Sequence, residues 1–159
     1  MGSDTDFRLD DAKEYDEEAK DEAIELLKFM FPDADRVGKN TDKYGIDIFV
    51  DWRGRRLWFE VEYKNFRDFG RIMNDGIHIA TRKMKFYESQ SRANHITFLN
   101  NYDRAIVIKN RFLVNTKIIT KSCSRRGDHY DGAKFLAVDY KNFMIYEKDC
   151  GLWEKTKGH

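Results

Sequence analysis

Apolar side chains recur at every third or fourth position near the start of the chain. The positions that form this stripe are Ala12, Tyr15, Ala19, Ala23, Leu26, Leu27 and Met30. Such spacing places them on one face of a helix, which can then be buried against a core. Pro32 disfavours the helical conformation in the residue before it. We therefore predict an amphipathic helix from Asp11 to Phe31, preceded by a flexible segment over residues 1–10.

The pattern then changes to strict alternation. Residues 46–51 alternate branched apolar side chains with other residues, and residues 57–64 repeat this alternation after a turn over residues 52–55. A period of two is typical of a strand that buries one face. Two such runs joined by a tight turn predict a β-hairpin.

Further elements follow along the chain. We predict a loop over 65–76, an extended piece at 77–79, a helix over 82–92, a turn at 100–103, strands at 95–99, 105–108 and 112–119, and a hairpin pairing 135–138 with 143–146. This order predicts a mixed α/β (α+β) fold in which one mixed sheet is flanked by helices and extended by C-terminal strands. No repeat or linker divides residues 1–159, so we expect a single domain.

Composition excludes several classes of protein. The chain is 41% hydrophobic and 36% charged, as in a globular domain with a highly charged surface. It has no long apolar run of the kind that crosses a membrane, and its first residues are acidic rather than basic, so we expect a cytoplasmic protein without membrane contacts. Cys123 and Cys150 lie far apart, and no two histidines have metal-ligand spacing, which argues against a disulfide framework and a zinc site. No glycine-rich phosphate loop is present.

The net charge of +1 conceals an asymmetry. Residues 1–25 hold eleven Asp or Glu against three Lys or Arg, whereas residues 26–159 hold seventeen against twenty-six. A basic body is typical of proteins that bind polyanions such as nucleic acid. An acidic helix beside ordinary surface lysines gives the same counts.

Charged residues in the predicted hairpin suggest a chemistry. Glu60, Glu62 and Lys64 occupy alternate positions of the second strand and should share one face, and we expect Asp47 to meet Glu62 across the hairpin. Carboxylate oxygens are the ligands that Mg²⁺ or Mn²⁺ prefers, and such an ion can activate water for phosphodiester hydrolysis. Lys64 can orient that water or stabilise the developing charge. The plainer interpretation is the charged face of a half-exposed strand.

The segment Gly45-Ile46-Asp47-Ile48, followed by Glu62-Tyr63-Lys64, resembles the PD-(D/E)xK nuclease superfamily, which has the restriction-endonuclease-like fold. The resemblance covers residues 12–100 and implies a core of helix, three strands, helix and strand. It implies that Asp47 and Glu62 bind the metal, with the backbone carbonyl of Tyr63, and that Lys64 is catalytic. Ile46 stands where the family pattern has proline. Glu60 could replace Glu62 only if the strand register shifted, and Lys64 would then lose its place.

The same resemblance implies residues around the centre. Many members carry an acidic residue on the first helix, and Glu22 flanks the apolar stripe here. The residues expected to contact nucleic acid are Arg53, Arg55, Arg56, Arg82, Lys83, Lys85, Arg125 and Arg126. For the three hairpin arginines, a charged turn that protects the strand edges is the alternative.

These observations lead us to expect an Mg²⁺- or Mn²⁺-dependent endonuclease, a hydrolase acting on nucleic acid, with DNA as the expected substrate. A homodimer is plausible because two copies of one site can cut two strands. Two alternatives stay open at this point. One is a nuclease-like module that binds nucleic acid or a protein without cleaving, and the other is a structural assembly factor that uses exposed aromatic strands.

Overall fold

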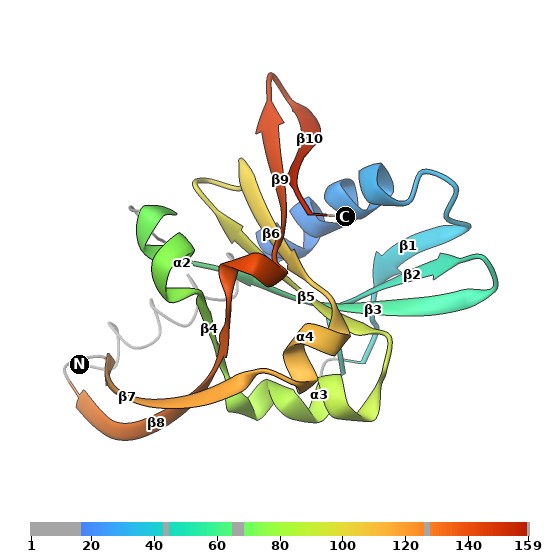
Figure 1. Cartoon of the computed structure of the whole chain (residues 1–159). Coiled ribbons are helices and arrows are strands. Elements are labelled where there is room, and N and C mark those ends of the chain that lie inside the picture. Colours follow the sequence, from blue (N-terminus) through green and yellow to red (C-terminus); the bar gives the residue numbers. More distant parts are fainter. Residues whose placement is uncertain (1–16, 43–44, 65–68, 126–127, 159) are drawn as a thin grey trace, which may run out of the picture.

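A seven-stranded mixed sheet forms the centre of the protein (Figure 1). The computed structural model describes residues 17–42, 45–64, 69–125 and 128–158, with the backbone alone over 121–131. Within this sheet β3 and β5 run parallel, and the other neighbouring strands run antiparallel. The strands, in spatial order, are β1 (Arg36–Lys39), β2 (Ile48–Trp52), β3 (Arg55–Tyr63), β5 (Ala93–Leu99), β6 (Arg104–Ile108), β9 (Met144–Asp149) and β10 (Leu152–Lys157).

A second sheet of three antiparallel strands lies beside the first, in the order β4 (Ile77–Ala80), β8 (Asp128–Val138) and β7 (Lys117–Arg125). In Figure 1 the β7–β8 arm extends away from the central sheet, and β4 connects α2 to the helical segment below it. Strand β4 is therefore an edge strand, paired with β8 on one side.

The helices cover both faces of the central sheet. They comprise the helix over residues 17–30, α2 (Phe69–Asp75), α3 (Met84–Ser89), α4 (Asn110–Val114) and two 3₁₀ turns, η1 (Thr81–Lys83) and η2 (Tyr140–Asn142). Among the described helices, none is both long and apolar enough to cross a membrane.

Two hydrophobic clusters pack against opposite faces of this sheet, because side chains alternate along each strand. The first joins the helix of residues 17–30, through Leu26 and Leu27, to Phe59 and Val61 of β3. The second joins α2, α3, α4 and the second sheet to the other face of β5 and β6. Polar residues of β3 that point away from the first cluster therefore face the second sheet.

Gly76 sets the path from α2 into β4. Its φ of +75° is a left-handed conformation that favours glycine, and its N–H donates to the Ile72 carbonyl at 2.8 Å. A Cβ at this position would collide with the carbonyl oxygen of Val138 in β8. Glycine is thus required at position 76 both by its φ angle and by the close approach of its backbone to Val138, which lets β4 pair with β8.

Several predictions are confirmed. The described part of the first predicted helix is helical over residues 17–30, whereas residues 11–16, like the predicted flexible segment 1–10, lie outside the described residues. The hairpin is β2–β3, the extended piece is β4, and the turn at 100–103 joins β5 to β6. The mixed sheet flanked by helices is likewise present, but the prediction of one sheet is wrong, because β4, β8 and β7 form a second sheet.

Three predictions of local structure are wrong. The predicted loop over 65–76 contains α2, whose Ile72 is buried in the second cluster. The predicted strand over 112–119 begins instead as α4, because packing of Leu113 into the second cluster overrides the β propensity of its neighbours. The predicted closing hairpin is split, since η2 carries the chain from β8 in one sheet to β9 in the other.

Candidate functional site

Strand β3 carries an acidic pair on the face that looks toward the second sheet. Phe59 and Val61 are buried in the first cluster, so Glu60 and Glu62 project to the opposite side, as the alternation predicted. Lys64 follows directly after the strand. This confirms that the three charged residues share a face.

Asp47 lies immediately before β2 rather than inside it. Because Ile48 is opposite Phe59, Asp47 reaches Glu60 instead of Glu62. Its backbone N–H donates to Glu60 Oε1 at 3.2 Å, and its Oδ2 accepts the Val61 N–H at 2.9 Å. The expectation that Asp47 meets Glu62 directly across the hairpin is therefore wrong by two residues of the register.

Glu60 is the most buried of the three carboxylates, with 5% of its surface exposed. Lys83 of η1 lies 3.5 Å from Glu60 Oε2, and Lys20 of the first helix lies 3.9 Å from Asp47 Oδ1. Burial and the negative charge of Asp47 raise the pKa of Glu60 to about 7, against the opposing effect of Lys83. Near neutral pH this side chain is therefore poised between its two protonation states.

Glu62 is held by two residues of β5. The parallel register places Thr97 beside Glu62 and His95 beside Glu60. His95 Nε2 and Thr97 Oγ1 each lie 3.0 Å from Glu62 Oε1. Burial alone would raise the pKa of Glu62, but the hydrogen bond from His95 and the positive charges of Lys64 and Lys83 outweigh it and hold this pKa below its usual value. Glu62 is therefore ionised at neutral pH.

A buried hydrogen-bond chain sets the orientation of Glu62. Tyr87 Oη lies 2.7 Å from His95 Nδ1. Because burial raises the pKa of Tyr87, its hydroxyl stays protonated and donates a hydrogen bond to Nδ1. Burial lowers the pKa of His95, which keeps the imidazole neutral. Its one ring proton then resides on Nε2 and is donated to Glu62.

Lys64 bridges the two sheets. Its Nζ donates to the backbone carbonyl of His78 in β4 at 2.6 Å and lies 3.7 Å from Glu62 Oε1. Its backbone N–H donates to the Phe98 carbonyl at 3.0 Å, which extends the β3–β5 pairing by one residue. The ammonium group is thus held beside Glu62 by an edge strand whose position depends on Gly76.

The structure does not bring Glu22 to this site. Glu22 Oε2 forms an ion pair with Lys148 Nζ of β9 at 3.0 Å. The residue of the first helix that contacts Asp47 is Lys20, a cation. The helical stripe identified the buried face correctly, but it could not show which flank turns toward β2.

The hairpin arginines also lie away from the site. Arg55 begins β3 and Glu62 is near its end, so they are separated by on the order of 20 Å at the rise of a strand. Arg56 makes two hydrogen bonds to Asp51 and stacks on Phe49, and Arg53 stacks on Trp52. These contacts are those of a charged turn.

The remaining predicted basic residues are divided. Lys83 points into the site through its contact with Glu60, whereas Arg82 and Lys85 are exposed on the neighbouring turn and helix. Arg125 ends β7, with its backbone alone described, and Arg126 lies outside the described residues.

The oxygen donors fit a hard divalent cation. The contacts found for Glu62 among the described residues all end on Oε1, which leaves Oε2 for a ligand. Asp47 supplies a second carboxylate, and Mg²⁺ or Mn²⁺ takes a few such oxygens and completes its shell with water. Within the described chain no group of three or more His, Cys, Asp or Glu side chains is placed to hold a metal ion.

Sequence reasoning missed several residues of this site: Lys20, Tyr87, His95 and Thr97, and the direct pairing of Glu60 with Asp47. His95 and Thr97 alternate along a predicted strand, which placed them on one face. What the sequence pattern did not contain was the parallel register that brings this face beside β3.

The raised pKa of Glu60 predicts a dependence of stability on pH. Folding favours the protonated carboxyl, so stability is greatest below the unfolded value of 4.5 and falls as pH rises toward 7. Replacing Glu60 with glutamine removes this loss. The stability of Glu60→Gln relative to wild type should therefore rise by about 2 kcal/mol between pH 5 and pH 8, measured by urea unfolding in EDTA. A constant difference across this range would contradict the burial argument.

The sequence was also compared with protein-family models and with curated proteins, and it matches none of them. A function for this site is therefore inferred from the residues and contacts of the chain itself.

Proposed function

We propose that the protein is an Mg²⁺- or Mn²⁺-dependent nuclease that hydrolyses phosphodiester bonds, with DNA as its substrate. The observation that carries this proposal is the arrangement around Glu62. The half-buried Glu62 carboxylate is held by His95 and Thr97, has Lys64 beside it, and lies on the same end of β3 as Asp47. We further propose that it acts in the cytoplasm, as a homodimer if both strands of a duplex are cut.

The order of elements supports the resemblance to the restriction-endonuclease-like fold. A helix over residues 17–30 is followed by β1, β2 and β3, then by α2, η1 and α3 with β4 of the second sheet between α2 and η1, and then by β5 beside β3. That is the helix, three strands, helix and strand that the PD-(D/E)xK resemblance implies. Under this proposal Asp47, Glu62 and Lys64 occupy the positions of its acidic residues and lysine.

Each side chain has a role under this proposal. Asp47 and Glu62, with the Tyr63 carbonyl, hold the divalent ion, which supplies positive charge to the phosphate and lowers the pKa of water. Lys64 orients the attacking water and stabilises charge on the phosphate oxygens. Glu60 and Lys83 position the backbone of Asp47 and balance charge behind it.

A second candidate is a module that binds nucleic acid without cleaving it. The observation that favours this alternative is that Lys20, Lys64 and Lys83 each lie within 4 Å of one of the three carboxylates. A balanced network of this kind can also stabilise the contact between sheets without any catalytic role. The two candidates differ in whether phosphodiester bonds are broken.

The test is cleavage of labelled single- and double-stranded DNA and RNA with Mg²⁺, with Mn²⁺ or with EDTA. We expect metal-dependent cutting by the native protein and a loss on the order of 10²-fold or more in Asp47→Asn and Glu62→Gln. Glu25→Gln is the matched control, since Glu25 is an exposed carboxylate of the first helix. If the folded native protein cuts none of the four substrates, the binding-only module replaces the nuclease.

A further inference from the structure

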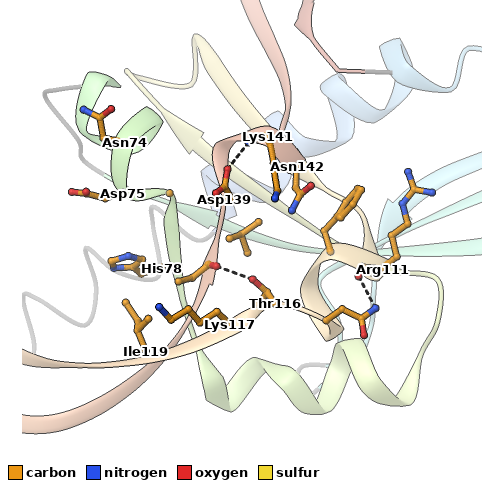
Figure 2. Close-up of a pocket in the computed structure, with 15 residues that line it drawn as sticks. Asn74, Asp75, His78, Arg111, Thr116, Lys117, Ile119, Asp139, Lys141 and Asn142 are labelled. Atoms are coloured by element: carbon orange, nitrogen blue, oxygen red, sulfur yellow. Dashed lines mark hydrogen bonds between the residues drawn. The ribbon is translucent and has the colours of Figure 1, made fainter.

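A hollow of about 540 Å³ opens away from the candidate catalytic residues, beside the three-stranded sheet (Figure 2). Its floor is formed by the outward face of β4, β7 and β8, where His78, Lys117 and Ala137 lie. Residues of α2, α4 and η2 form its walls. In Figure 2, His78 and Lys117 lie toward one side of the hollow and Arg111 toward the other.

A second hollow of about 200 Å³ continues from the first. The two share Arg111 and Phe112 of α4 and Lys141 and Asn142 of η2. Together they make one elongated depression, which runs from β4 past α4 to the end of β10. Five cations line it, and we call it the basic groove: Lys109, Arg111, Lys117, Lys141 and Lys157.

The cations of this groove outnumber the carboxylates that line it, five to two. Within the part of the chain that the structure describes, none of its five cations forms an ion pair with a carboxylate. Two carboxylates also line it: Asp139 accepts the Lys141 N–H at 2.9 Å and keeps its charge, and Asp75 lies 3.9 Å from Arg71, which is outside the lining. The groove therefore attracts anions from solution.

We propose that the basic groove binds the phosphate backbone of a nucleic-acid strand, outside the catalytic residues. This inference rests on the proposed function and adds to it the path of the substrate. The cations are spread along two joined hollows, which suits a chain of phosphates better than one small anion. Asn142 adds an amide donor.

One residue connects the groove to the candidate catalytic site. The side chain of His78 lines the groove, and its backbone carbonyl accepts the hydrogen bond from Lys64. A strand lying in the groove therefore passes along β4, whose other side holds the catalytic lysine. None of the five groove cations was among the residues that the sequence analysis expected to contact nucleic acid.

The test measures binding without cleavage. The affinity of a fluorescent single-stranded oligonucleotide is determined by anisotropy in EDTA, over a series of salt concentrations. Lys117→Ala/Lys141→Ala should weaken binding about tenfold and make the slope of log K against log salt shallower by about 1.4, at roughly 0.7 for each phosphate that is no longer neutralised. Lys28→Ala/Lys155→Ala, which removes two exposed lysines elsewhere, should change neither, and Lys117→Arg/Lys141→Arg should retain binding.

Wild-type affinity and salt slope in Lys117→Ala/Lys141→Ala would overturn the inference, as would absence of binding by the native protein. Cleavage measured in parallel separates it from the proposed function. If the double variant binds and cuts like the native protein, the groove inference is rejected and the proposed nuclease function stands. If the native protein binds the oligonucleotide but cuts no substrate, and the double variant loses binding, the groove inference is supported and the nuclease function is rejected.

Discussion

Replacing Lys64 with alanine is expected to slow metal-dependent phosphodiester cleavage by about 10²–10⁴-fold, the contribution typical of a positioned proton-transfer group. The ammonium group lies 3.7 Å from Glu62 Oε1 and is fixed by the His78 carbonyl at 2.6 Å. No other described cation lies this close to Glu62, so the loss cannot be compensated locally. The measurement is the single-turnover rate on the substrate that the native protein cuts best.

Two controls make this result specific. Lys28→Ala removes an exposed lysine of the first helix and should leave the rate unchanged. The urea midpoint of Lys64→Ala shows whether the variant is folded, since Lys64 also holds β4 against β3. A folded Lys64→Ala protein that cuts at the native rate would remove Lys64 from the mechanism.

Replacing His95 with alanine should destabilise the fold by about 3 kcal/mol, the second large effect. His95 is fully buried, and its loss leaves the Tyr87 hydroxyl without a partner, removes one of the two hydrogen bonds to Glu62 and creates a cavity. Unfolding in urea measures this cost. The catalytic consequence is separate: with Glu62 no longer oriented, half-maximal cleavage should need more Mg²⁺, a readout that destabilisation alone does not move.

The companion variant is Tyr87→Phe, which removes one hydroxyl from the same chain. It should cost about 1 kcal/mol, and its effect should not add to that of His95→Ala, because both break the same hydrogen bond. Independent, additive costs in this double-mutant cycle would show that Tyr87 and His95 do not act together.

The sequence predicted one strand of the site well. Alternation alone placed Glu60, Glu62 and Lys64 on one face of β3, because a strand has only two faces. The hairpin was also predictable, but its register was not: Asp47 meets Glu60 because Ile48 pairs with Phe59, two residues away from the pairing that the sequence analysis expected. A shift of two residues keeps every side chain on its face of the strand but changes which carboxylates touch.

What the sequence could not provide was the contact between elements that are distant along the chain. His95 and Glu62 are 33 residues apart, and Lys64 meets β4 through a backbone carbonyl, which any residue would offer. The short helices α2 and α4 were missed for a related reason. Each is stabilised by burying an apolar side chain, Ile72 or Leu113, in the second cluster rather than by its own propensity.

The parallel pairing of β3 with β5 also bears on how the protein folds. Antiparallel neighbours such as β2 and β3 are joined by a tight turn and can pair outward from it. The parallel pair β3 and β5 must first close a loop of about thirty residues, which slows folding. Glu62, His95 and Thr97 come together only in that step. The site is thus assembled by a pairing between strands that are distant along the chain, and a nascent chain carries these residues apart until that pairing forms.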